Sequence, residues 1–113
     1  MRLVITYLNG PSQGRDVVVD NFPARIGKNC ANCSIPLNDR DAGATVADIV
    51  NTNDSLVLRS ERQDCRIELN GRRVAAGKGR ALRTGDVIET GRTLLLVGLN
   101  ERASGFSGRR GGR

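Results

Sequence analysis

The feature that most constrains this fold is a series of short apolar runs, each followed by residues that favour tight turns. Clusters of Gly, Asn and Asp separate the runs, and these residues tolerate the positive φ that tight turns require. No window of helical length shows a sustained 3.6-residue apolar period. The runs are Leu3–Leu8, Val17–Val19, Ala24–Ile26, Ile35–Leu37, Val46–Val50, Leu56–Leu58, Ile67–Leu69, Val87–Ile88 and Leu94–Val97. The pattern predicts an all-β fold, an antiparallel sandwich or barrel.

Two of the turns predict specific hairpins. Asn70-Gly71 lies between Ile67–Leu69 and Arg72–Val74, and both turn residues accept positive φ. Thr90-Gly91 is predicted to close a second hairpin into a last strand over 92–99.

Composition argues against catalysis. The chain has no histidine, and therefore lacks the commonest general base and the commonest neutral metal ligand. The sequence shows no Ser-His-Asp set, and Gly77-Lys78-Gly79-Arg80 lacks the strand and helix that a P-loop requires. We therefore expect a protein that is not an enzyme and that needs no cofactor.

Length and charge divide the chain into two parts. Residues 1–100 are predicted to form one domain, with a core of Val, Ile, Leu and Ala because only Phe22, Phe106 and Tyr7 are aromatic. Residues 101–113 are rich in Gly, Arg and Ser and are predicted to be a flexible tail or linker. The tail has four arginines against one glutamate, which is half of the net charge of +6. We expect a cytoplasmic chain, since it shows neither an export signal nor an apolar stretch of bilayer length.

Four stretches, in order, resemble the forkhead-associated (FHA) family over most of residues 2–99. They are Gly10–Gly14, Arg25-Ile26-Gly27-Lys28, Ser34–Asp39, and Leu69-Asn70-Gly71 followed by Leu82–Gly91. The resemblance implies an FHA-type sandwich of about eleven antiparallel strands. It also implies a protein or phosphothreonine-peptide partner, bound by loops at one end of the sandwich. Many bacterial FHA-like domains, including those of secretion-apparatus ring proteins, look like phosphate-independent docking modules.

The residues expected at that end depart from the family's phosphothreonine signature. Lys28 stands where the family has arginine, and it keeps a charge but loses bidentate geometry. Gly43 and Ala44 replace the phosphate-binding serine and its polar neighbour, and Cys65 replaces the amide that clamps the peptide. The resemblance therefore predicts a binding module whose phosphate pocket is lost or rebuilt.

A rebuilt pocket would need substitute groups from the same loops. Thr45 and Ser34 offer hydroxyls, and Arg40 and Arg66 offer charge. The predicted ligand-binding residues of these loops are Lys28, Arg40, Gly43, Ala44, Thr45, Cys65 and Arg66.

Three cysteines leave several alternatives open. Cys30 and Cys33 form a CxxC pair, and the FHA scaffold would bring Cys65 to the same end. We expect partly buried free thiols and no metal, with a three-thiolate metal site or a disulfide to Cys65 as alternatives.

The tail gives an alternative function. Arg109-Arg110-Gly111-Gly112-Arg113 resembles an RGG segment, and mobile positive charge is enough for nonspecific nucleic-acid binding. Phe106 is the only aromatic residue in the tail that could stack on a base. A protein-interaction module is therefore the preferred prediction, and a basic nucleic-acid-associated protein is the alternative.

Overall fold

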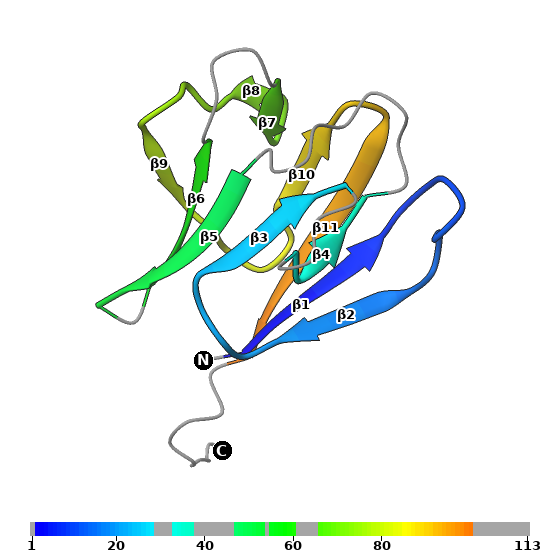
Figure 1. Cartoon of the computed structure of the whole chain (residues 1–113), viewed down its shortest axis with the longest axis horizontal. Helices are drawn as coiled ribbons and strands as arrows, with labels where there is room; N and C mark the ends of the chain where they lie inside the picture. The colour runs from blue at the N-terminus through cyan, green and yellow to red at the C-terminus, as the bar shows by residue number, and fades with distance from the viewer. Residues whose placement is uncertain (1, 29–32, 38–46, 54, 61–65, 101–113) are drawn as a thin grey trace.

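The computed structural model describes residues 2–28, 33–37, 47–53, 55–60 and 66–100. These residues form eleven strands and no helix, which confirms the all-β prediction (Figure 1). The strands are β1 (Arg2–Tyr7), β2 (Asp16–Val19), β3 (Ala24–Gly27), β4 (Ile35–Pro36), β5 (Ala47–Thr52), β6 (Ser55–Ser60), β7 (Ile67–Leu69), β8 (Arg72–Arg73), β9 (Gly79–Ala81), β10 (Val87–Thr90) and β11 (Thr93–Asn100). Within the described ranges there is no helix of the length and apolarity that crossing a bilayer demands. The predicted tail, 101–113, lies outside the described residues.

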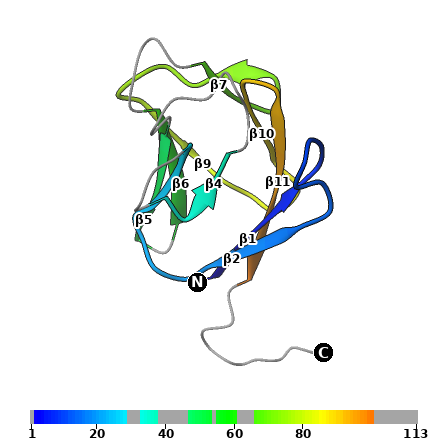
Figure 2. The same ribbon diagram turned by 45° about the vertical axis from the view of Figure 1, so that its right-hand side comes forward.

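The strands form two sheets that face each other across the core (Figure 2). One sheet has six strands in the order β2-β1-β11-β10-β7-β8, and the other has five in the order β4-β3-β5-β6-β9. The strand pairs are antiparallel, as predicted, with one correction: β4 pairs with β3 in parallel. β4 runs in the same direction as β3, whereas β5, the next strand along the chain, runs antiparallel to β3.

The core is built by side chains that alternate along each strand. In β1, Leu3, Ile5 and Tyr7 are buried while the residues between them are partly exposed. In β6, Leu56 and Leu58 are buried on the core side of the other sheet. Each fully buried aliphatic side chain contributes about 1.5–3 kcal/mol to folding. The core therefore forms from aliphatic residues of both sheets, as the composition predicted.

Turn chemistry fixes the hairpins. Asn70 (φ 53°) and Gly71 (φ 83°) connect β7 to β8, and Leu69 pairs with Arg72, so the predicted two-residue turn is confirmed. In the second hairpin Thr90 pairs with Thr93, so the turn residues are Gly91 and Arg92. The last strand therefore begins one residue later than predicted. It also extends one residue further.

The candidate site lies at one end of the sandwich, and we call this end the apical end. In the five-stranded sheet the end of β3, the start of β5 and the end of β6 meet there, since Ile26 pairs with Ala47 and Ala47 with Ser60. In the six-stranded sheet the end of β1 and the start of β7 lie at the corresponding end. The N-terminal strand begins at the opposite end, where Arg2 pairs with Asn100 (Figure 1).

Candidate functional site

The structure describes two of the seven predicted binding residues, and both lie at the apical end. Lys28 directly follows β3 and is half-buried, and Arg66 directly precedes β7 and is exposed. Ser34, a predicted substitute hydroxyl, is exposed just before β4. The other predicted residues lie outside the described residues and stay predictions: Arg40, Gly43, Ala44, Thr45 and Cys65.

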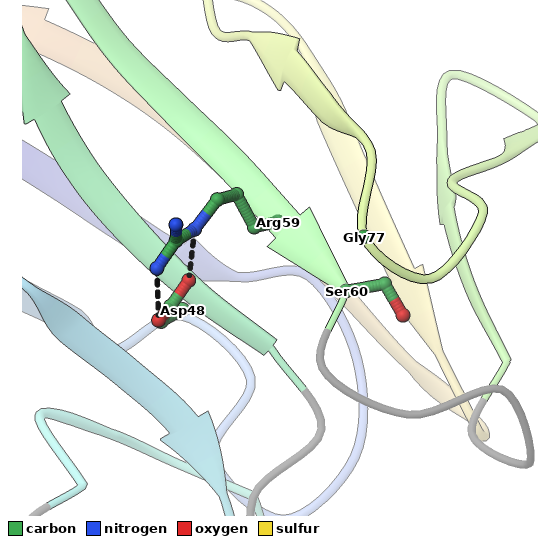
Figure 3. A pocket seen from close by; sticks show the side chains of 4 residues that line it. All are labelled: Asp48, Arg59, Ser60 and Gly77. Atoms are coloured by element: carbon green, nitrogen blue, oxygen red, sulfur yellow. Dashed lines mark hydrogen bonds and ion pairs between the residues drawn. The ribbon is translucent and has the colours of Figure 1, made fainter.

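An ion pair that the sequence analysis missed lies next to these residues. Arg59 in β6 donates from Nε to Oδ1 of Asp48 (3.1 Å) and from Nη2 to Oδ2 (3.0 Å), as Figure 3 shows. Asp48 lies in β5 directly opposite Arg59, and it is 7% exposed. A two-point hydrogen bond of this kind fixes the guanidinium plane as well as its position. The two opposite charges therefore form one rigid unit at the apical end.

The ion pair lines a pocket of about 280 Å³, which we call the apical pocket. The described residues that line it are Asp48, Arg59, Ser60 and Gly77 (Figure 3). The amide of Gly77 donates to the carbonyl of Ser60 at 3.3 Å, which holds the segment before β9 against the end of β6. The lining is polar, so the pocket suits a polar side chain better than an apolar one.

Arg66 also has a carboxylate partner. Its Nε lies 3.1 Å from Oε2 of Glu68, two residues further along β7. The Arg66 side chain is 76% exposed, so the pair contributes little to stability. It nevertheless gives the Arg66 guanidinium a carboxylate neighbour within the chain.

Cys33 is disulfide-bonded in this structure. The expectation of free thiols is therefore wrong for Cys33. The other two cysteines, Cys30 and Cys65, lie outside the described residues. A disulfide sulfur is not a thiolate, so this bond and the three-thiolate metal site exclude each other. Among the described residues no group of three or more Cys, Asp or Glu side chains is placed to hold a metal ion.

The ion pair could have been found from the sequence. Asn53 lies in the turn between β5 and β6 with φ 52°, a conformation that asparagine tolerates. The turn makes Thr52 and Ser55 partners, and counting back along both strands from that pair brings Asp48 opposite Arg59. The missing step was to derive the strand register from that turn.

Comparison with known proteins gives a result for the fold only. No protein-family model matches the sequence, and no curated protein matches it. The structure is similar to the FHA domain of a hypothetical protein from Arabidopsis thaliana, with a TM-score of 0.82 and 22% identity over 96% of this chain and 91% of that one.

Two bacterial structures are also similar. Mycobacterium tuberculosis EmbR, in complex with a low-affinity phosphopeptide, matches with a TM-score of 0.74 and 19% identity, over 95% of this chain and 26% of EmbR. The cytoplasmic domain of PscD, a T3SS sorting platform protein from P. aeruginosa, matches with a TM-score of 0.71 and 18% identity, over 86% of this chain and 79% of that one. Together with the eleven strands in two sheets, these likenesses establish that the chain has the forkhead-associated fold.

Proposed function

We propose that the chain is a non-enzymatic protein-interaction module that docks a protein partner at its apical end and does not require phosphate on that partner. The fold supports an interaction module, since EmbR is solved with a phosphopeptide and PscD is a sorting platform protein. The apical pocket offers a concave polar surface at the same end as the predicted binding loops.

One observation carries the preference for phosphate-independent docking: Arg59 and Arg66, the two described arginines closest in sequence to the predicted binding position Cys65, already have carboxylate partners. A phosphothreonine carries about −1.5 to −2 charge at neutral pH and is bound best by uncompensated arginines. Arg59 is held by Asp48 and Arg66 by Glu68. Lys28 has no ion pair among the described residues, and a lysine is a point charge without bidentate geometry. The described apical groups are therefore better suited to a partner of lower charge.

The experiment compares partner capture before and after phosphate removal. The chain is immobilised and exposed to lysate of its source organism, in one arm native and in the other treated with a protein phosphatase. We expect the same captured partner in both arms. Loss of the partner after treatment, or its displacement by a phosphothreonine peptide, would show that binding requires phosphate and would overturn the proposal.

Two variants with the same change of charge test at which end of the sandwich the partner binds. Lys28→Glu changes the charge at the apical end, and Arg83→Glu makes the same change at the opposite end, where Leu82 donates its amide to the carbonyl of Leu56. Capture is expected to fall for Lys28→Glu and to stay unchanged for Arg83→Glu. The reverse result would move the docking surface away from the apical end.

A further inference from the structure

A row of four residues crosses the outer face of the five-stranded sheet, and its two middle members, Asp48 and Arg59, line the apical pocket. Arg25 in β3 pairs with Asp48 in β5, Asp48 with Arg59 in β6, and Arg59 with Gly79 in β9. Directly paired residues lie on the same face of a sheet. The neighbours of this row along β3 and β5, Ala24, Ile26, Ala47 and Ile49, are fully buried in the core, so the row points away from it.

The charges along this row are unequal. Asp48 forms an ion pair with Arg59, although Arg25 is its neighbour on the other side. Arg25 is exposed and has no ion pair among the described residues. Lys78, which follows Gly77 of the apical pocket, is also exposed and without an ion pair in the described part of the chain. Asp48 is thus the one acidic group that the described residues place on this row.

Arg59 is both held and accessible. Asp48 fixes its guanidinium with two hydrogen bonds, yet 51% of the Arg59 side chain stays exposed. Figure 3 shows one terminal nitrogen pointing away from Asp48. A guanidinium that is already oriented loses less side-chain entropy when a ligand binds.

The position beyond Arg59 carries no side chain. A Cβ at Gly79 would lie 2.6 Å from Cγ1 of Val57, a distance too short for two carbon atoms. Glycine therefore lets β9 approach β6 closely.

We propose that the apical pocket binds the carboxylate of an acidic residue in the partner, held by Arg25, Arg59 and Lys78. This proposal rests on the proposed docking function and names the chemistry of the partner's segment. The row Arg25-Asp48-Arg59 has one net positive charge, which complements a single carboxylate.

The test uses nitrogen-15-labelled full chain and three capped peptides as probes. One peptide is hexaglutamate, one is hexaglutamine, and one carries phosphothreonine among neutral residues. We expect hexaglutamate to shift the Arg59 Nε–H and Gly77 amide resonances saturably at low salt, and hexaglutamine to leave them unchanged. Stronger binding of the phosphothreonine peptide at these same resonances would identify a phosphate site and overturn the proposal.

The deciding variant is Arg25→Gln, because Arg25 is exposed and its removal breaks no ion pair among the described residues. Loss of one solvent-exposed ion pair weakens hexaglutamate binding by about two- to fivefold. Arg25→Lys should keep most of the affinity, and Arg83→Gln, with the same loss of charge at the opposite end, should keep all of it. Equal weakening by Arg25→Gln and Arg83→Gln would reduce the effect to net charge and overturn the proposal.

The two proposals fail separately. If the captured partner is retained by Arg25→Gln but lost by Lys28→Glu, docking at the apical end stands and the carboxylate site is wrong. If partner capture depends on phosphate while hexaglutamate still maps to Arg59 and is weakened by Arg25→Gln, the phosphate-independent function is wrong and the carboxylate site stands.

Discussion

The hydroxyl of Tyr7 donates a hydrogen bond to the carbonyl oxygen of Pro36 at 2.6 Å. Tyr7 ends β1 in the six-stranded sheet, and Pro36 ends β4 at the edge of the five-stranded sheet. The bond therefore joins the two sheets at the apical end. It also gives a partner to the phenol of a residue that is only 4% exposed.

Replacing Tyr7 with phenylalanine should lower the free energy of unfolding by about 1–2 kcal/mol, because the carbonyl of Pro36 loses its donor in a partly buried site. Urea denaturation followed by circular dichroism measures the change. A variant as stable as the parent chain would show that water replaces the phenol at no cost.

The pKa of Tyr7 is raised above its ordinary value of 10.0 because burial disfavours the phenolate. Tyr7 is the only tyrosine, so phenolate absorbance during a pH titration reports this residue alone. The native midpoint should lie above that of the urea-unfolded chain. Since the folded state holds the proton more tightly, the stability that Tyr7 contributes is complete below pH 10.0 and is lost as pH rises through the folded pKa. Coincident midpoints would contradict this.

A double-mutant cycle on Asp48 and Arg59 should give a coupling energy of about 1–2 kcal/mol, between exposed ion pairs and well-formed hydrogen bonds to charged groups. Arg59→Ala leaves the Asp48 carboxylate buried without its partner, so Asp48→Ala added to it should cost little more. Unfolding in urea at low and high salt measures each variant. If the losses of unfolding free energy in the two single variants add up to the loss in the double variant, the bidentate geometry contributes nothing.

Gly79→Ala should destabilise the chain by about 1–3 kcal/mol, since the new methyl meets Cγ1 of Val57 at 2.6 Å. Val57→Ala in the same chain should recover part of that loss. Gly98→Ala is the matched control in a strand, because its Cβ would lie 3.6 Å from the carbonyl oxygen of Val4, an ordinary contact. Equal effects of Gly79→Ala and Gly98→Ala on the unfolding free energy would contradict the steric explanation.

The disulfide at Cys33 predicts one free thiol among the three cysteines of the oxidised chain. Thiol titration in denaturant should give one thiol before reduction and three after it. Three thiols before reduction, in protein purified without a reductant, would contradict the disulfide.

The fold was predictable because local chemistry and long-range pairing agree. Asn70-Gly71 has the positive φ that its residue types favour, and the alternation in β1 matches its burial. β9 was missed because Gly79-Arg80-Ala81 has neither alternation nor β-branched residues. It is a strand because Val57, Leu58 and Arg59 of β6 supply its pairing partners. Tertiary pairing overrode a weak local preference there.

The candidate site was less predictable. Family-like motifs predicted that Lys28 and Arg66 lie at one end of the sandwich, and the structure places both at the apical end. The turn between β5 and β6 predicts that Asp48 lies opposite Arg59, but the sequence could not show that two hydrogen bonds join their side chains, or that Arg66 is paired with Glu68. Those contacts depend on side-chain rotamers, which are settled only when the sheets assemble.

The pairing of Arg2 with Asn100 affects how this domain can be connected to other protein segments. Because the first and last strands start and finish side by side, the polypeptide enters and leaves the sandwich at almost the same point. A domain of this kind can be inserted into a surface loop of a host protein, or have its ends joined and the chain reopened at another turn. When the domain is inserted into a host in this way, the apical pocket lies at the end of the sandwich opposite to the point of attachment.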